Sequence, residues 1–259
     1  MIKVAVAGCM GRMGSTIVSA IENTDGIEVI CGIDPAAASH DAVPFPIYST
    51  IDKAIDECDI DVLVDFTRPD VVATNVESAL CVGIDCVVGT TGLSTETLES
   101  LAKGAADNAA LFYAPNFTTG AVLMMQFAKI AAPFFPQAEV IEFHHCNKLD
   151  SPSGTAVQTA RLMGESRGGV ASEAPGSETE VAGAQGARGA LIDGIPVHSV
   201  RSSGYVASQE VILGSYGQSL TIRHDSWDRE SYMPGVLLGI RSVGDMQGLI
   251  VGLENLMDI

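Results

Sequence analysis

Residues 2–34 read I-K-V-A-V-A-G-C-M-G-R-M-G-S-T-I-V-S-A-I-E-N-T-D-G-I-E-V-I-C-G-I-D, and this stretch decides the fold that we expect. The continuous apolar run Ile2–Ala7 is typical of a strand buried in a parallel sheet. A loop with three glycines, 8–14, follows it, then a helix, and then a second strand, Ile27–Ile33, which ends at Asp34. This order predicts a dinucleotide-binding unit. The spacing is G-x-x-G-x-x-G instead of G-x-G-x-x-G, so the position of the loop and its distance to Asp34 carry most of the argument.

The alternation of strands and helices continues to about residue 113 and predicts a parallel sheet flanked by helices. Ligands bind such sheets outside the carboxyl ends of the strands, so the residues that follow each strand are candidates for cofactor binding. Taken singly, each is also explained as an ordinary turn residue. The expected strands are Asp61–Phe66, Ile84–Val88 and Ala109–Tyr113, the expected helices are Pro69–Leu80, one from near Ser94 and Thr118–Ala132, and the candidates are Thr67, Gly89, Thr90, Thr91, Pro115 and Asn116.

A second informative stretch is residues 139–156, E-V-I-E-F-H-H-C-N-K-L-D-S-P-S-G-T-A. Its apolar run, Val140–Phe143, predicts a buried strand that ends in His144 and His145. Neighbouring residues on a strand point to opposite faces, so both imidazoles cannot face one ligand if the strand continues. A lone histidine is more often structural than catalytic, and the neighbouring residues must decide.

The part after this strand is expected to form a loop with Lys148 and then a helix over about Ala156–Met163. Ser151 or Ser153 would cap this helix, with Pro152 in its first turn. The unpaired N–H groups and the positive end of the helix favour an anion, and Lys148 favours one as a point charge. The stretch therefore predicts a site for a small ligand with carboxylates, beside groups that can move protons.

The pattern changes beyond residue 163. Residues 164–189 are rich in Gly, Ala, Ser and Glu without a clear period and predict a long mobile excursion.

We divide the chain into a dinucleotide-binding domain, 1–116, completed by C-terminal helices in 225–259, and a second α+β domain, 117–224, with a mixed or antiparallel open sheet. The second domain is expected to have successive antiparallel strands at Pro196–Ser202, Val206–Leu213 and Ser219–His224, with a turn at Tyr216 and Gly217, and the tail to have helices at Arg229–Val243 and near Leu253.

The composition excludes several classes of partner. The net charge of −18 argues against nucleic acid and against an anionic membrane surface. The longest apolar stretch, Ala121–Phe135, is broken by polar residues and proline, so no membrane span is expected. The six cysteines form no C-x-x-C and suit reduced, mostly buried thiols in a cytosol. We therefore expect a cytoplasmic protein with no metal site.

Five motifs that occur in this order, G-C-M-G-R-M-G at 8–14, D-F-T at 65–67, G-T-T-G at 89–92, A-P-N-F at 114–117 and the 139–156 stretch, resemble those of the dihydrodipicolinate reductase family. The resemblance covers essentially the whole chain, and H-H-x-x-K-x-D-x-P-S-G-T-A is its most specific part. It implies a Rossmann-type first domain, NADH as cofactor with NADPH as a second possibility, and a homotetramer assembled through the sheet of the second domain.

The resemblance also implies a reaction and a role for individual residues. The family reduces 4-hydroxy-tetrahydrodipicolinate, a small cyclic dicarboxylate, to tetrahydrodipicolinate in lysine and diaminopimelate biosynthesis. It implies that His144 is the general acid and that Lys148 is a second proton donor or an electrostatic stabiliser. Ser151 stands where the family usually has alanine, which puts no catalytic residue in doubt. The implied cofactor-binding residues are Gly8, Cys9, Met10, Gly11, Arg12, Met13, Gly14, Asp34, Phe66, Thr67, Gly89, Thr90, Thr91, Ala114, Pro115, Asn116 and Phe117, and the implied substrate-binding residues are His145, Lys148, Ser153, Gly154 and Thr155.

The residue chemistry favours the same reaction and NADH. Hydride addition to a conjugated imine leaves electron density that must be protonated, and a histidine can supply that proton at neutral pH. Asp34 can accept hydrogen bonds from both ribose hydroxyls, and no Arg or Lys follows it to receive a 2′-phosphate. Arg12 could lend partial charge to that phosphate, so NADPH stays open.

Two alternatives come from other classes of function. A related two-domain NAD(P)-dependent amino- or hydroxy-acid dehydrogenase would share the first domain and lack the 139–156 stretch. A nucleotide-sensing regulator would need no proton donor, and His144 and Lys148 speak against it. Neither H-E-x-x-H nor G-x-S-x-G occurs, so the motifs of metal-dependent hydrolysis and of the Ser-His-Asp type are missing.

Overall fold

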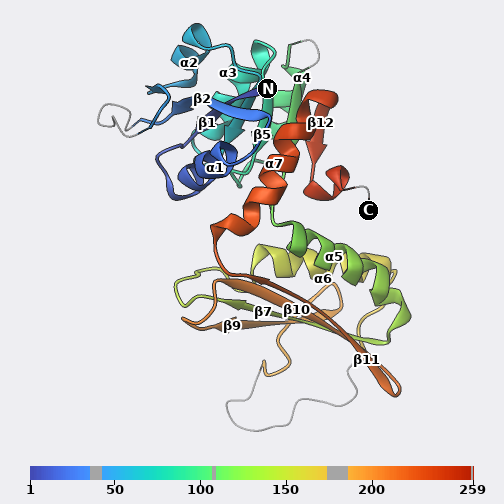
Figure 1. The fold of residues 1–259 in the computed structure, drawn as a ribbon. Helices are drawn as coiled ribbons and strands as arrows, with labels where there is room; N and C mark the ends of the chain where they lie inside the picture. Colours follow the sequence, from blue (N-terminus) through green and yellow to red (C-terminus); the bar gives the residue numbers. More distant parts are fainter. Residues whose placement is uncertain (36–42, 107–108, 174–185, 258) are drawn as a thin grey trace. The chain divides into compact units, whose positions relative to one another are not determined.

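The computed structural model describes residues 1–35, 43–106, 109–173, 186–257 and 259. These residues form two compact units, Met1–Thr119 with Arg229–Ile259, and Gly120–Asp228 (Figure 1). The boundaries expected after residues 116 and 224 lie three and four residues from those of the units, which end at 119 and 228.

The first unit is built around one parallel sheet. Its strands are β1 (Ile2–Ala7), β2 (Ile27–Ile33), β3 (Ile47–Tyr48), β4 (Val62–Asp65), β5 (Asp85–Val88), β6 (Ala110–Tyr113) and β12 (Gly248–Val251), and its helices are α1 (Arg12–Glu22), α2 (Ile51–Glu57), α3 (Val72–Cys81), α4 (Thr95–Lys103) and α7 (Met233–Ser242), with 3₁₀ turns η3 (Arg229–Tyr232), η4 (Val243–Asp245) and η5 (Leu253–Leu256). The strand order is β12-β6-β5-β4-β1-β2-β3, and every pairing is parallel.

Helices cover both faces of this sheet, which explains why its central strands are continuously apolar. Helix α1 contacts α7 on one face, while α3 contacts α2 and α4 on the other (Figure 1). Val4 to Ala7 of β1 are completely buried. The strand order reverses between β1 and β4, so the switch point, where such sheets bind ligands, lies at the carboxyl ends of these two strands.

The second unit is a mixed sheet with two helices. It contains α5 (Thr119–Ala131), α6 (Gly154–Ser166), the 3₁₀ turn η2 (Ala132–Phe134) and the strands β7 (Gln137–His144), β8 (Ala190–Ile192), β9 (Ile195–Arg201), β10 (Ala207–Ser215) and β11 (Gln218–Ser226). The strand order is β11-β10-β7-β9-β8, with β7 and β9 parallel and the other pairs antiparallel. Helices α5 and α6 lie on one face of the sheet (Figure 1). Along β7, Val140 and Glu142 are fully buried, whereas the alternate residues Ile141 and Phe143 are only half-buried.

The fold class that the sequence predicts, a Rossmann-type parallel sheet with a second α+β unit, is confirmed. One pairing prediction is wrong. The three strands after residue 195 are not successive neighbours, because β7 lies between β9 and β10 and runs parallel to β9. Only β10 and β11 form a hairpin, which turns at Tyr216 and Gly217 as expected. Local sequence favours hairpins between consecutive strands, but burial of β7 at the centre of the sheet overrides this preference.

The start of α6 also differs from the prediction. Ser153 is the N-cap and its hydroxyl oxygen accepts a hydrogen bond from the Ala156 amide (3.2 Å), so Pro152 lies before the helix and not in its first turn. The helix continues to Ser166, three residues beyond the expected end at Met163. Four short elements, α2, β3, β8 and β12, were not predicted. Part of the excursion expected at 164–189, residues 174–185, lies outside the described residues.

Two predictions from composition can be compared with the described residues. No helix among them is both long and apolar enough to cross a membrane. All six cysteines are free; Cys9, Cys31 and Cys86 are buried as expected, but Cys81 and Cys146 are exposed. The expectation of mostly buried thiols is therefore wrong for these last two, which lie at the end of a helix and in the loop after β7.

Candidate active site

The glycine loop after β1 is shaped by backbone contacts that only glycine permits. Gly8 has φ +77°. A Cβ at Gly14 would lie 2.0 Å from the carbonyl oxygen of Gly8. The amide of Gly11 donates to that same oxygen (2.9 Å). The N-cap of α1 is Gly11, which has no side chain to cap the helix. The amides of the first turn of α1 therefore face the loop without a capping side chain. This compact start of a helix can receive the pyrophosphate of a dinucleotide.

Asp34 lies beside this loop, as the spacing predicts. Its carboxylate accepts a hydrogen bond from the Met10 amide (3.2 Å), and its own amide donates to the Tyr48 carbonyl (2.8 Å). Burial raises the pKa of the neighbouring Cys9 thiol to about 11, so this side chain stays neutral. Asp34 is therefore an acidic group held beside the glycine loop, and its binding of a ribose stays a prediction.

One buried carboxylate, Asp65 at the end of β4, ties two of the predicted cofactor-binding loops together. Its Oδ1 accepts hydrogen bonds from the hydroxyls of Thr67 (2.7 Å) and Thr90 (2.9 Å), and its Oδ2 accepts one from Asn75 (2.9 Å). Asp65 is completely buried. The side chains of Thr67 and Thr90 are thus used to fix the loops after β4 and β5. Asp65 was missed as a site residue, although an acid that ends an apolar strand was a visible signal.

Aromatic packing joins the remaining predicted segments. The Phe66 ring lies 5.3 Å from that of Phe117, centroid to centroid, and a Cβ at Gly89 would lie 2.2 Å from the Phe66 ring. A Cβ at Gly8 would lie 3.1 Å from the Phe66 carbonyl oxygen. The structure therefore brings the loops after β1, β4, β5 and β6 together at one edge of the sheet. The side chains of Ala114 and Phe117 are buried and shape this edge from within, while Arg12, Thr91 and Pro115 are exposed.

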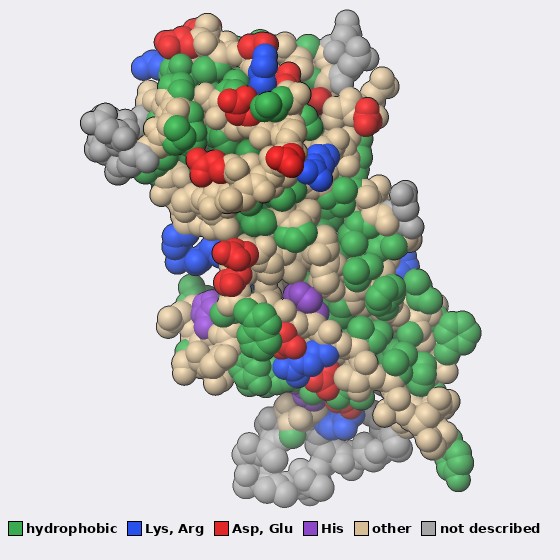
Figure 2. Space-filling model, viewed as in Figure 1, with side chains coloured by type: hydrophobic (Ala, Val, Ile, Leu, Met, Phe, Trp, Pro, Cys, Tyr) green, Lys and Arg blue, Asp and Glu red, His purple; other side chains and the backbone are tan. Residues whose placement is uncertain are grey.

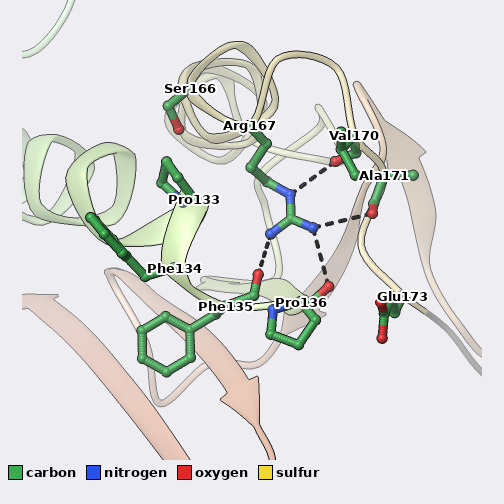
Figure 3. A pocket seen from close by; sticks show the side chains of 9 residues that line it. All are labelled: Pro133, Phe134, Phe135, Pro136, Ser166, Arg167, Val170, Ala171 and Glu173. Carbon is green, nitrogen blue, oxygen red and sulfur yellow. Dashed lines mark hydrogen bonds between the residues drawn. The ribbon is translucent and has the colours of Figure 1, made fainter.

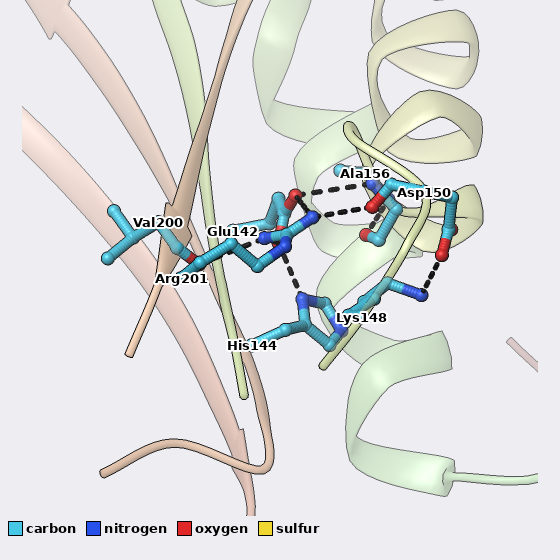
Figure 4. A network of polar contacts seen from close by, with 8 residues as sticks. Glu142, His144, Lys148, Asp150, Ala156, Val200 and Arg201 are labelled. Atoms are coloured by element: carbon cyan, nitrogen blue, oxygen red, sulfur yellow. Dashed lines mark hydrogen bonds and ion pairs between the residues drawn. The ribbon is translucent and has the colours of Figure 1, made fainter. Parts of the chain in front are cut away.

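The second unit gathers the predicted proton-transfer residues around another buried carboxylate (Figure 4). Glu142, on β7, is completely buried. Its Oε2 lies 2.5 Å from Nδ1 of His144, which is two residues further along the strand and therefore on the same face. Arg201, at the end of β9, donates to both carboxylate oxygens at 2.8 Å. The arrangement leaves Nε2 as the ring nitrogen of His144 that Glu142 does not use.

Lys148 and the start of α6 lie in the loop that follows. The Lys148 ammonium is 2.8 Å from the Asp150 carboxylate, and this hydrogen bond is the main reason that the pKa of Asp150 is lowered. The Ser153 hydroxyl oxygen accepts a hydrogen bond from the Ala156 amide. The amides of Gly154 and Thr155 remain at the open end of the helix. A Cβ at Gly154 would have no heavy atom within 4 Å. An ammonium, an imidazole and an open helix start thus occur together, which suits an anionic ligand.

His145 behaves differently from His144. Strand β7 ends at His144, so the alternation of faces does not apply to its neighbour, and His145 is exposed at the beginning of the loop. Its carbonyl accepts a hydrogen bond from the Lys148 amide (3.1 Å). The backbone of His145 therefore helps to form the turn that carries Lys148.

Two residues of this site, Glu142 and Arg201, were missed by the sequence analysis. Glu142 had a signal, because an acid two positions before His144 on a strand must share its face. The prediction treats Glu142 as part of the apolar run Val140–Phe143. Arg201 had no local signal, since it is 59 residues from Glu142 and reaches it only through the parallel pairing of β7 and β9.

A surface hollow in the second unit has a different character. It lies around Arg167, whose guanidinium donates to the carbonyl oxygens of Phe135, Pro136, Val170 and Ala171 (Figure 3). The guanidinium of Arg167 donates its hydrogen bonds to these carbonyl oxygens, which attaches the chain after α6 to the segment around η2. Arg167 is accordingly a structural residue.

The charged groups of the described residues do not suggest other kinds of site. No cluster of three or more His, Cys, Asp or Glu that could hold a metal ion occurs among them. On the face drawn in Figure 2, acidic side chains are spread among uncharged ones and do not form one patch. The glycine loop with its acid, together with a separate unit that carries an imidazole and an ammonium, defines the class of two-domain NAD(P)-dependent oxidoreductases.

Comparisons with known proteins place the chain within this class. The family model described as "Dihydrodipicolinate reductase, N-terminus" matches residues 2–117, and the one described as "Dihydrodipicolinate reductase, C-terminus" matches residues 120–257. The chain therefore belongs to the dihydrodipicolinate reductase family. The alternative of a related amino- or hydroxy-acid dehydrogenase is not favoured.

Individual relatives match over nearly their full length. The 4-hydroxy-tetrahydrodipicolinate reductase of Listeria welshimeri is 46% identical over 265 residues, which cover 99% of this chain and 100% of the relative. That of Mycolicibacterium smegmatis is 45% identical over 259 residues, 99% of each chain. The solved structure of dipicolinate-bound dihydrodipicolinate reductase from Paenisporosarcina sp. TG-14 has a TM-score of 0.88 at 38% identity, over 98% of this chain and 99% of that one.

Proposed function

We propose that the chain catalyses the NAD(P)H-dependent reduction of 4-hydroxy-tetrahydrodipicolinate to tetrahydrodipicolinate, a step of lysine and diaminopimelate biosynthesis. The observation that carries the proposal is the grouping of His144, Lys148 and the open start of α6 in one loop of the second unit. The named activity of the full-length relatives and the dipicolinate held by the solved relative support it.

The residues of the second unit account for the recognition of a dicarboxylate. The amides of Gly154 and Thr155 and the hydroxyl of Thr155 can donate to one carboxylate, which the positive end of α6 also attracts. Lys148 can pair with a carboxylate as a point charge by turning from Asp150. We also assign two further residues to the substrate-binding set. Ser153 belongs to it because it caps the start of α6, and His145 belongs to it because its imidazole is exposed at the beginning of the loop.

The proton requirements of the reaction agree with His144. The overall change removes water from the 4-hydroxy ring, adds one hydride and takes up one proton. NAD(P)H supplies the hydride when it is bound to the first unit. His144, held through Nδ1, presents Nε2 as the proton donor to the reduced ring, and Lys148 stabilises the negative charge or is the second candidate donor of this one proton.

The first unit fits the cofactor. Gly8, Gly11 and Gly14 allow the tight turn that brings the start of α1 to the end of β1, where a pyrophosphate can bind, and the residues after β4, β5 and β6 that the resemblance implies lie along the same edge of the sheet. We propose NADH as the preferred cofactor, because Asp34 would meet the 2′-phosphate of NADPH with a carboxylate. Arg12, exposed at the start of α1, is the residue through which NADPH could still be accepted.

We also propose a cytoplasmic homotetramer assembled through the sheet of the second unit. The sheet face opposite α5 and α6 carries apolar residues that stay half-buried in the single chain, among them Ile141, Phe143, Val200 and Ile212. Free cysteines are the form that a reducing compartment maintains. Light scattering on the purified protein measures the oligomeric state, and a stable monomer would contradict the assembly.

The test of the function is a direct assay. NADH or NADPH oxidation is followed by absorbance with the condensation product of pyruvate and aspartate semialdehyde, prepared immediately before use. We expect turnover that depends on this substrate. A chain that binds NADH but does not oxidise it with this substrate would refute the proposed activity.

A further inference from the structure

One ion pair, the buried Glu142 with the partly buried Arg201, contacts three parts of the proposed substrate site in the second unit. The Glu142 carboxylate contacts Nδ1 of His144 (2.5 Å) and accepts a hydrogen bond from the Ser153 amide (3.3 Å), at the start of α6. Its partner Arg201 donates to both oxygens of Glu142 and to the carbonyl of Asp150 (2.7 Å). Figure 4 shows these contacts converging on Glu142 from β7, β9 and the loop.

We propose that Glu142 and Arg201 are the positioning pair of this site: Glu142 sets the orientation and charge of His144, and Arg201 fixes the loop that carries Lys148. The inference rests on the proposed function for its kinetic consequences and on the geometry alone for its structural ones. Neither residue touches the reacting atoms; each acts through a neighbour.

The charge of Glu142 is what makes it more than a packing residue. Burial on its own would raise the pKa of this carboxyl, but hydrogen bonds from His144, Arg201 and Ser199 outweigh burial and lower the pKa to about 2. Glu142 is thus an anion at neutral pH. An anion at Nδ1 accepts a hydrogen bond from that nitrogen, which fixes the tautomer of the ring and leaves Nε2 as the nitrogen that Glu142 does not use.

Arg201 has the geometry that the second role needs. Both terminal nitrogens of its planar guanidinium donate to Glu142, and one of them, Nη2, also donates to the Asp150 carbonyl. Arg201 thereby joins β7 to the loop in a fixed orientation. Because Lys148 belongs to the loop that reaches Asp150, the contact at the Asp150 carbonyl fixes the backbone from which the ammonium extends. A lysine at position 201 would keep the charge but could not make both contacts in the same geometry.

The same strand provides a matched control. Glu139 lies three residues before Glu142 and on the opposite face of β7, and it too pairs with a histidine, His198 (2.8 Å), and with an arginine, Arg188 (2.5 Å). Its side chain is partly exposed, and it has no contact with the loop of Lys148. Removing its charge tests whether loss of any glutamate from this sheet has the same effect.

The decisive measurement is the pH titration of His144 by NMR, in the intact protein, with Glu142→Gln and Glu139→Gln compared with the unaltered chain. The chain has five histidines, so the His144 signal is assigned by its loss in His144→Gln. Among the residues that the structure describes, Glu142 is the charged group bonded to the His144 ring, Asp150 acts on it electrostatically, and Arg201 and Lys148 belong to the same network (Figure 4). Glu142→Gln is expected to move the measured His144 titration to lower pH than in the unaltered chain, because the ring loses the anion at Nδ1, whereas Glu139→Gln should leave it in place.

The kinetic readout separates the two members of the pair. In Glu142→Gln the alkaline limb of the turnover profile should move to lower pH by the same amount as the titration. In Arg201→Lys the cation is retained, so the His144 titration should stay in place while KM for the dicarboxylate rises about tenfold through the loosened loop. NADH binding, measured by fluorescence, should be unchanged in both variants because it belongs to the other unit.

Each outcome has a defined meaning. An unchanged His144 titration in Glu142→Gln, or an equal shift in Glu139→Gln, overturns the positioning role. If Glu142→Gln does not fold, the double variant Glu142→Gln/Arg201→Gln, which leaves no unpaired buried charge, is titrated and compared with Arg201→Gln, so that the two proteins differ only in the Glu142 anion. A shifted titration in a protein that is inactive on the proposed substrate leaves the pair standing and refutes the proposed function alone.

Discussion

Replacing Gly14 with alanine tests the cofactor loop most directly. Gly14 is buried in the first turn of α1, and a Cβ there would lie 2.0 Å from the carbonyl oxygen of Gly8 and 2.8 Å from Cα of Cys9. Real Cβ atoms essentially never come within 3.0 Å of such neighbours, so the loop must move by at least about 1 Å. Both neighbours are backbone atoms, and no change of rotamer can relieve the contact.

The cost of this movement follows from the bonds around Gly8. Its carbonyl accepts from the Gly11 amide (2.9 Å) and its amide donates to the Ile33 carbonyl (2.8 Å). Weakening the two costs about 0.5–1.5 kcal/mol each, and overpacking costs about 1–3 kcal/mol. The better helix propensity of alanine offsets about 1 kcal/mol. We therefore expect a net destabilisation of about 3 kcal/mol.

Two assays read the result. The melting temperature should fall by about 6–12 °C, taking roughly 2–4 °C per kcal/mol for a chain of this size. The kcat/KM for NADH should fall by about 100-fold, because the groups that hold the pyrophosphate are displaced by about 1 Å.

The control is Gly104→Ala, at the end of α4 in the same unit. A Cβ there would meet no atom closer than 3.6 Å, and Gly104 already has φ −84°, so neither quantity should change. If Gly14→Ala melts and uses NADH like the unaltered protein, then the close approach of α1 to the loop, and the place of the loop under the cofactor, are both refuted.

Four further predictions concern the chemistry of the two units. His144→Gln and Lys148→Ala should each lower turnover, by about 10²–10⁴-fold for the general acid, and should leave NADH affinity measured by fluorescence almost unchanged; turnover at the unaltered rate in either variant would remove its role. Gly154→Ala should keep the melting temperature, because a Cβ there has no heavy atom within 4 Å, while KM for the dicarboxylate rises about tenfold as the methyl group enters the carboxylate position; an unchanged KM would contradict the substrate contact. The ratio of kcat/KM values at saturating substrate should favour NADH over NADPH, and a clear preference for NADPH would overturn the role of Asp34. Because the folded pKa of Glu142, about 2, lies below its ordinary value of 4.5, its stabilisation is present above about pH 4.5 and is lost as the pH falls towards 2. Urea unfolding across this range should show a loss of stability that is larger, by up to about 3 kcal/mol, in the unaltered chain than in Glu142→Gln.

The first unit could be predicted closely because its signals are local. A strand buried on both faces must be apolar throughout, and the run from Val4 to Ala7 is. A tight turn into a helix requires residues without a Cβ, and Gly8 and Gly14 occur where the turn needs them. Each of these requirements concerns neighbouring residues, so the sequence alone expresses it.

The candidate site in the second unit could be predicted only in part. His144, Lys148 and Ser153 lie within ten residues of one another, and their proximity is enforced by the chain. The carboxylate that orders them stood in the same stretch, but its importance depends on complete burial, which the local pattern did not show. Short elements such as β3 and β12 were missed because two to four residues give too little periodicity to separate a strand from a loop.

The sequence by itself determined the parallel first unit, the glycine loop with its acid and the loop that carries the proton-transfer residues, because strand, turn and helix-start chemistry act over a few residues. Only the tertiary structure decided that β7 lies between β9 and β10 and that Arg201 meets Glu142. Strand pairing across such separations is selected by the burial of whole strand faces and by the pairing of a buried carboxylate that cannot be left without a cation. These are properties of the assembled sheet, and no single segment of the chain contains them.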